Sequence, residues 1–106
     1  MPRSSAAPVF AALGDETRLR LVRRLCDDGP ASITQLTSGS RVTRQAVTKH
    51  LRVLERAGIV RGERRGRESL WQLEQQRLEE ARHYLDLISQ QWDDVLARLK
   101  KHVETD

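Results

Sequence analysis

The sequence has one cysteine, three prolines, four aromatic residues and no long apolar run. A single cysteine can form neither an intrachain disulfide nor a metal site of several thiolates, and we interpret Cys26 as a small apolar side chain buried on a helix. No apolar segment approaches the roughly 18 residues that a membrane span requires. The N-terminus also lacks the continuous hydrophobic segment of a signal peptide. The sequence therefore predicts a cytoplasmic protein with no membrane partner.

Acidic residues are scarce in one quarter of the chain. The net charge of the 106 residues is +4, but residues 41–68 hold nine bases against three acids, whereas residues 1–40 hold five against four and residues 69–106 hold five against eight. Such segregation of positive charge is typical of a surface that binds a polyanion. With 38% hydrophobic and 32% charged residues, the chain as a whole fits one small, helix-rich domain.

The basic block begins with SRVTRQAVTKHLR, residues 40–52, in which five of the thirteen residues are Arg, Lys or His and none is acidic. Thr43 is a strong N-cap for a helix that Gly58 ends. One face of that helix can pack into a core through three apolar residues, Val47, Leu51 and Leu54. The basic residues fall on the opposite face, which is therefore available to a partner.

Capping and turn residues divide the rest of the chain. We expect residues 1–7 to form a disordered tail and residues 8–106 to form one domain. Three helices before the basic block are predicted from their caps: residues 8–13 stopped by Gly14, residues 16–28 capped by Asp15, and residues 33–39 capped by Ser32. After Gly58 the apolar period changes, and two short strands joined by a basic turn at Gly66 fit residues 59–73.

The last predicted helix, residues 75–103, carries apolar residues at alternating steps of three and four. This heptad seam comprises Leu78, Ala81, Leu85, Ile88, Trp92, Val95 and Leu99, and His102 takes the next seam position. A helix of ~28 residues is ~42 Å long, which is more than a domain of this size can cover. The excess apolar face predicts a second copy of the chain as a partner, with ordinary core packing as the alternative.

The short predicted helix that Ser32 caps and the helix that follows Thr43 have the layout of a helix-turn-helix, which predicts double-stranded DNA as a partner. The first turns of a recognition helix meet base edges, whereas a basic hairpin after it forms a wing that contacts the minor groove or the backbone. The predicted DNA-binding residues are Arg41, Thr43, Arg44, Gln45, Thr48, Lys49 and Arg52 in and before the helix 43–57, and Arg64, Arg65 and Arg67 in the wing 61–68. Of these, Arg44, Gln45 and Thr48 are placed for bases, and Lys49, Arg52 and the wing arginines for phosphates or the minor groove.

The order and spacing of these motifs resemble the ArsR-type winged-helix repressors over roughly residues 9–103. The family's D-x-T-R-L-R entry to the second helix is matched at residues 15–20, and its recognition-helix pattern is matched at Thr43, Thr48, His50 and Leu51. The resemblance implies a mainly α fold with a small β-hairpin, a winged helix-turn-helix with a long C-terminal dimerisation helix. It also implies a homodimeric repressor, assembled through the first and last helices, that binds a palindromic operator. The expected dimer-interface residues are Phe10, Leu13, Leu78, Leu85, Ile88, Trp92, Val95 and Leu99.

Metal-sensing members of that family carry ligands that this sequence lacks. Their Cys-x-Cys in the helix before the turn is replaced here by ASITQL, residues 31–36, and the ligand spacings of their last helix are absent around Asp86 and His102. The C-terminal helix resembles the metal-independent branch instead. We therefore expect no metal and no cofactor, while the operator sequence, the regulated genes and any small-molecule effector are not determined by the sequence.

Other classes of function compete with a DNA-binding regulator. An enzyme is disfavoured, because the sequence shows no glycine-rich phosphate loop, no cluster of ligands and no nucleophile with a suitable base. A winged helix that binds other proteins, without specific DNA binding, is the stronger alternative, and a neutral or acidic recognition face would favour it. A winged helix of the MarR or PadR type is a further interpretation, disfavoured by the short first helix and by the order of the motifs.

Overall fold

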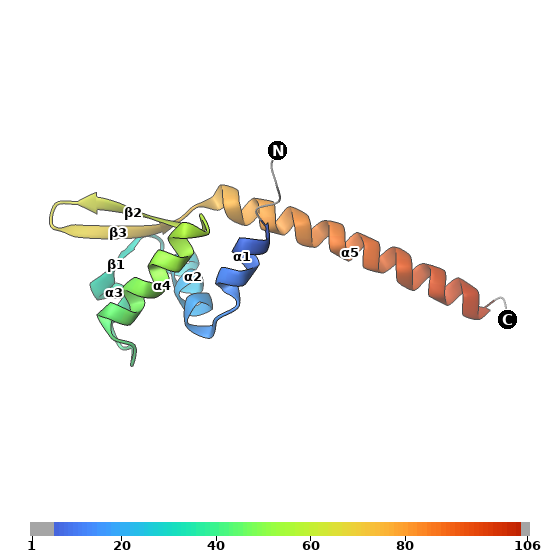
Figure 1. The fold of residues 1–106 in the computed structure, drawn as a ribbon, viewed down its shortest axis with the longest axis horizontal. Coiled ribbons are helices and arrows are strands. Elements are labelled where there is room, and N and C mark those ends of the chain that lie inside the picture. The colour runs from blue at the N-terminus through green and yellow to red at the C-terminus, as the bar shows by residue number, and fades with distance from the viewer. Residues whose placement is uncertain (1–5, 105–106) are drawn as a thin grey trace.

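The computed structural model describes residues 6–104, which form five helices and three short strands. In chain order these are α1 (Ala6–Leu13), α2 (Glu16–Asp28), β1 (Ala31–Ser32), α3 (Ile33–Thr37), α4 (Arg44–Arg56), β2 (Val60–Arg65), β3 (Glu68–Leu73) and α5 (Gln75–Glu104). Helices α1 to α4 and the sheet form a compact head, the β2–β3 hairpin extends from it on one side, and α5 projects on the other (Figure 1). The predicted fold class, mainly helical with a small sheet and a long last helix, is confirmed.

Side-chain caps set the helix boundaries, as the sequence predicts. The Asp15 carboxylate accepts a bond from the backbone N–H of Arg18 at 3.0 Å, and Thr43 Oγ1 accepts one from Ala46 at 3.1 Å. Ser32 forms a capping box with Gln35, in which each side chain accepts from the other residue's backbone N–H. These bonds satisfy donors that the first turn of a helix leaves unpaired, so α2, α3 and α4 begin where the sequence predicts.

The ends of the first and third helices differ from the prediction. Helix α1 begins at Ala6 rather than at Pro8, so the predicted disordered tail does not extend over Ala6 and Ala7. Ala6 is buried, which gives the two added residues a packing contact. The rest of the predicted tail, residues 1–5, lies outside the described residues. Helix α3 ends at Thr37, two residues early.

The sheet contains a strand that the sequence analysis does not predict. Its order is β1-β3-β2, with both pairs antiparallel, and Trp71 of β3 lies opposite Ala31 on one side and opposite Gly62 on the other. Strand β1 has only two residues, which is too short for an alternating pattern to reveal it. It joins the middle of β3 to the segment just before α3.

The core lies between the inner face of α4, the sheet and helices α1 to α3. Leu51, Leu54 and Ile59 are fully buried, and Trp71 covers this cluster from β3. The prediction that Cys26 is buried is wrong, because its side chain is exposed. Helix α2 contacts the core through a narrow stripe formed by Leu21 and Leu25, which lie one turn apart. Cys26, the residue after Leu25, lies outside this stripe and is exposed.

Only the first turns of α5 contact the head. Leu78 packs against the core and Ala81 is buried, and the ring of Tyr84 lies 6.1 Å from that of Phe10 on α1. From there α5 runs free of the head, which gives the molecule its longest extent of 68 Å. Within residues 6–104, none of the helices combines the length and apolar character that crossing a membrane requires.

Candidate nucleic-acid interface

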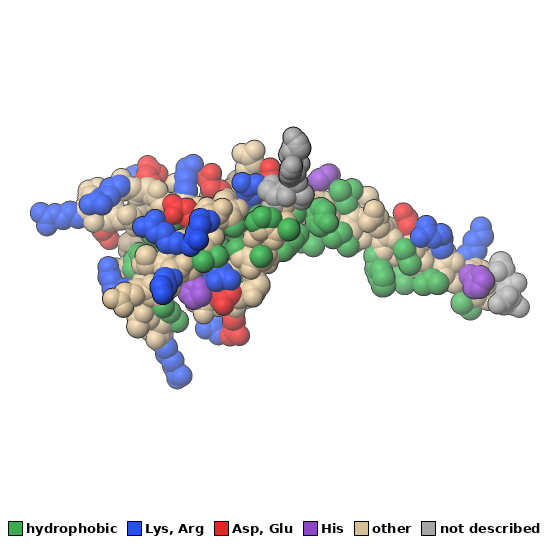
Figure 2. All heavy atoms as spheres, viewed as in Figure 1, with side chains coloured by type: hydrophobic (Ala, Val, Ile, Leu, Met, Phe, Trp, Pro, Cys, Tyr) green, Lys and Arg blue, Asp and Glu red, His purple; other side chains and the backbone are tan. Residues whose placement is uncertain are grey.

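Helix α4 has two chemically different faces. Val47, Leu51 and Leu54 on its inner side are each at most 1% exposed. The predicted contact residues Arg41, Thr43, Arg44, Gln45, Lys49 and Arg52 are all exposed, and Thr48 is half-buried. The prediction of one packed face and one basic face is therefore confirmed, and Figure 2 shows basic side chains gathered over this end of the head and over the hairpin.

Arg44, at the first turn of α4, is oriented by a residue that the sequence analysis does not include. Its Nη1 donates to Thr34 Oγ1 of α3 at 3.0 Å. Thr48 Oγ1 donates to the backbone carbonyl of Arg44 at 2.8 Å, so the hydroxyl proton of Thr48 is already used within the helix. Thr34 has no signal in the sequence, because its role depends on how α3 packs beside α4.

Arg52 lies where α4 meets the hairpin. Its Nη1 is 3.2 Å from Glu55 Oε1, and its guanidinium carbon lies 5.8 Å from the centroid of the Trp71 ring. A guanidinium within about 6 Å of an indole face is attracted by the ring electrons. Trp71 thus connects the position of the hairpin to a basic residue of α4, a link that sequence spacing does not reveal.

The hairpin presents its arginines on both faces. Successive side chains of a strand alternate between faces, so Arg64 shares a face with Trp71, while Glu63 and Arg65 share the other. Arg65 Nη2 lies 3.6 Å from Glu63 Oε2, and Arg64 Nε donates to the carbonyl of Gly66 in the turn at 3.2 Å. Arg64, Arg65 and Arg67 are all exposed, as predicted.

A cleft of about 250 Å³ brings the basic residues of the helix and of the hairpin together. Its lining includes Arg44 and Arg52 from α4, Arg67 from the turn of the hairpin, one carboxylate, Glu68, and hydroxyl groups of Thr34, Thr48 and Ser69. Three arginines and several hydroxyls are donors suited to the oxygens of a phosphate backbone. The two predicted contact elements therefore form one continuous surface, which we call the basic surface.

Comparison with known proteins agrees with this geometry. A family model described as a helix-turn-helix domain matches residues 13–63. The helix-turn-helix-type transcriptional regulator YuzN of Bacillus subtilis (strain 168) is 38% identical over 65 residues, which cover 56% of this chain and 71% of YuzN. The transcriptional repressor SmtB of Mycobacterium tuberculosis is 30% identical over 92 residues, which cover 87% of this chain and 66% of SmtB. An ArsR-like transcriptional regulator from Rhodococcus sp. RHA1, known from a solved structure, superposes with a TM-score of 0.78 at 35% identity over 92% of this chain and 91% of that protein.

The chain belongs to the ArsR-type family of winged-helix regulators. It is a DNA-binding transcriptional regulator, with α3 and α4 as its helix-turn-helix and the β2–β3 hairpin as its wing. Within residues 6–104 no three His, Cys, Asp or Glu side chains lie together in an arrangement that could hold a metal ion.

This ArsR-type regulator also exposes an apolar surface, along α5. Leu85 is 52% exposed, Trp92 60% and Leu99 56%, and green side chains follow the lower side of the helix in Figure 2. Of the other predicted interface residues, Ile88 is exposed, and Phe10, Leu13, Leu78 and Val95 are half-buried. The structure thus leaves most of the predicted seam without a cover inside the protomer.

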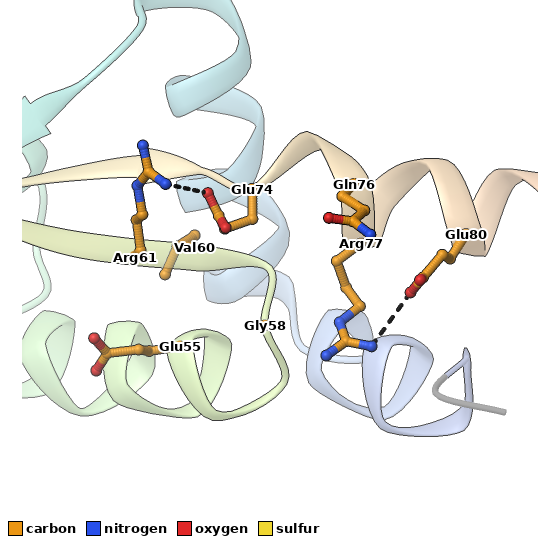
Figure 3. A pocket seen from close by; sticks show the side chains of 8 residues that line it. All are labelled: Glu55, Gly58, Val60, Arg61, Glu74, Gln76, Arg77 and Glu80. Carbon is orange, nitrogen blue, oxygen red and sulfur yellow. Dashed lines mark hydrogen bonds and ion pairs between the residues drawn. The ribbon is translucent and has the colours of Figure 1, made fainter. Parts of the chain in front are cut away.

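A second cleft, of about 380 Å³, lies at the base of the wing and differs in charge from the basic surface (Figure 3). Its lining carries both signs, and its charged groups are paired: Arg61 lies 3.1 Å from Glu74, and Arg77 lies 3.2 Å from Glu80. Because the lining holds two arginines against three glutamates (Glu55, Glu74 and Glu80), the cleft has no excess of positive charge to attract DNA. It marks the limit of the basic surface.

The contact between Gly62 and Trp71 predicts the cost of a small substitution in the wing. A Cβ added at Gly62 would lie 3.2 Å from two carbons of the Trp71 ring, and that ring is 4% exposed and packed in the core. We expect Gly62→Ala to lower the free energy of unfolding by ~1–3 kcal/mol through overpacking, measured by denaturant titration.

Unfolding can be followed by tryptophan fluorescence. In a background in which Trp92 is replaced by Phe, this signal comes from Trp71 alone. The control Glu68→Ala, at an exposed position of the same hairpin, should change stability by less than about 0.5 kcal/mol, and an equally small effect of Gly62→Ala would contradict this account.

Proposed function

We propose that the protein is a homodimeric transcriptional repressor that places one α4 helix in the major groove at each half of a palindromic operator. The observation that carries the proposal is the basic surface, on which Arg44 and Arg52 of α4 share one cleft with Arg67 of the wing. A wing beside a recognition helix can contact the backbone or the minor groove while the helix is in the major groove. The relatives of the protein include the transcriptional repressor SmtB, which supports the proposal that the protein represses transcription and does not activate it.

Within this proposal, base reading and backbone binding are carried by different residues. Arg44 and Gln45 lie at the first turn of α4, from which a recognition helix contacts base edges. Arg can donate two bonds to guanine, and Gln can pair with adenine. Lys49 and Arg52 lie farther along the helix and suit phosphates, as do Arg41 and the wing arginines. Thr43 and Thr48 contribute mainly through their bonds to the helix backbone.

The dimer is part of the proposal, and the exposed apolar face of α5 supports it. The side chains of the seam from Leu85 to Leu99 remain about half exposed. A contiguous apolar surface of this kind marks a site where another protein binds. A second copy offers the same stripe, so the two can pack as in a coiled coil. Phe10 of α1 lies beside the first part of α5 and extends the interface towards the head. Leu13, at the C-terminal end of α1, is the second residue of this helix that we assign to the interface.

Further parts of the proposal concern chemistry and location. We infer a metal-independent regulator without enzymatic activity that acts in the cytoplasm, where bacterial and archaeal DNA is accessible. The first point rests on residues 31–36, ASITQL, which carry no ligand where metal-sensing members have Cys-x-Cys. The competing function is that of a winged-helix module that binds only other proteins. Retention of the protein on a heparin column that does not decrease as the salt concentration rises would favour this alternative.

Trp92 provides a test of the dimer. Trp92→Glu places a charge within the proposed seam, where burying it without a partner is costly, so we expect monomers and a loss of operator binding. Gln90→Glu introduces the same charge on the opposite side of α5 and should leave the dimer intact. Sedimentation velocity at micromolar concentration measures both. Wild-type protein that sediments as a monomer under these conditions would refute the dimer.

The division of roles on α4 can be tested by titrating an operator at several salt concentrations. Arg44→Ala should cost ~1–3 kcal/mol of binding and relax the preference at particular base pairs. Lys49→Ala should weaken binding to all sequences alike. It should also reduce the slope of log affinity against log salt by about 0.9 for each lost phosphate contact, hence by nearly two for a dimer. If both variants lose affinity uniformly with the same change of slope, the assigned roles are false.

A further inference from the structure

One arginine of α2 connects three elements of the head at the junction below α4. The backbone N–H of Arg18 donates to Asp15, the N-cap of α2, at 3.0 Å. Its side-chain Nε donates to the carbonyl of Ala12, in the last turn of α1, at 2.5 Å. Its Nη1 lies 3.3 Å from His50 Nδ1 of α4. A single guanidinium therefore joins the end of α1 to the recognition helix.

The chemistry of these groups fixes the direction of the contact with His50. Arginine has donors and no acceptor, so His50 Nδ1 must be the acceptor, and the proton of the neutral ring lies on Nε2. The same Nδ1 is 3.8 Å from Asp15 Oδ2, and the His50 side chain is 25% exposed. The imidazole thus has two alternative partners: Arg18 when it is neutral, and the Asp15 carboxylate when Nδ1 carries a proton.

The position of this contact relates it to DNA binding. His50 lies on α4 between Lys49 on the basic face and Leu51 in the core. Helix α1 packs against α4 and also against α5, where Phe10 meets Tyr84. The route from α1 through Arg18 to His50 therefore connects the helices of the proposed dimer interface to the helix that would contact bases.

We propose that Arg18 is a positioning residue for operator binding, which holds α4 against the end of α1 through His50. This inference rests on the proposed function, because the quantity it controls is the affinity for the operator. Arg18 acts without touching DNA: two of its side-chain donors are directed to Ala12 and His50 inside the head. Removing either end of the bridge frees α4 to shift against α1 while every phosphate contact is retained.

The bridge depends on the charge state of His50. A protonated imidazole cannot accept a hydrogen bond from Arg18, and its charge repels the Arg18 guanidinium. The Asp15 carboxylate, by contrast, attracts the protonated imidazole. The pKa of Asp15 is lowered by the hydrogen bond from the backbone N–H of Arg18, so this carboxylate stays charged when histidine gains a proton. A further charged side chain, Arg56 of α4, lines a groove together with Arg18. On α4 itself, the residues one turn from His50 are uncharged: Ala46, Val47, Val53 and Leu54.

The sign of the pH effect distinguishes this mechanism from simple electrostatics. The neutral ring makes the bridge, so the contribution of the bridge to operator affinity is present at higher pH and is lost as pH falls and His50 is protonated. A proton added near DNA would by itself strengthen binding to a polyanion. The bridge therefore predicts weaker binding in acid, where charge alone predicts tighter binding.

The experiment measures operator affinity by fluorescence anisotropy at neutral and at mildly acidic pH, and at several salt concentrations. His50→Leu removes the acceptor, Arg18→Met removes the donors, and His50→Gln keeps an acceptor that cannot gain a proton. We expect His50→Leu and Arg18→Met to bind the operator about tenfold more weakly at neutral pH, the scale of one hydrogen bond to a charged group. Their salt slopes should match the wild type. His50→Gln should bind like the wild type at neutral pH and lose less affinity in acid.

Several results would overturn the proposal. Arg18→Met with a salt slope reduced as in Lys49→Ala would make Arg18 a phosphate contact instead of a positioning residue. His50→Leu with wild-type affinity, or His50→Gln with an unchanged pH profile, would show that the bridge is not needed. If Arg18→Met fails to fold, as thermal unfolding would reveal, the two His50 variants still decide. Wild-type protein that binds no selected operator would refute the proposed function itself, a distinct outcome.

Discussion

The burial of one face of α4 is the constraint on which the rest of the structure depends. Val47, Leu51 and Leu54 are almost completely removed from water, and together they fix both the position of the helix and its rotation about its own axis. Because side chains on a helix point in fixed directions, this rotation decides which residues face outward. The basic surface exists because the apolar stripe on the opposite side holds the helix in one orientation.

The remaining elements orient and complete that surface. Strand β1 pairs with β3 and holds the hairpin against the head, so that Trp71 can lie beneath the guanidinium of Arg52. Thr34 of α3 orients Arg44. The cleft in Figure 3 shows where the basic surface stops, since its lining holds three glutamates against two arginines. Positive charge is thus in excess on the basic surface, whose cleft is lined by three arginines and one glutamate, as expected of a surface that binds DNA.

The features that sequence could predict are those with local physical causes. Caps at Asp15, Ser32 and Thr43 depend on residues three positions away, and the amphipathic faces of α4 and α5 follow from helical periodicity alone. The features that it missed depend on tertiary packing. Strand β1 needs β3 beside it, and Cys26 is exposed because the contact stripe of α2 is narrow. Thr34, which orients Arg44, and Trp71, which lies under the guanidinium of Arg52, come from other elements. The roles of single residues at DNA remain predictions, because they depend on a partner that the chain alone does not supply.

The central claim is that two α4 helices, held at a fixed distance by a dimer, contact two related sites on DNA. Sequencing of DNA fragments selected by the purified protein from a random pool tests it most directly. The account predicts an enriched inverted repeat whose half-site centres lie about one helical turn, roughly 10 base pairs, or a multiple of it apart. Enrichment of a single unrepeated site, or no enrichment above that of a random sequence, would contradict it.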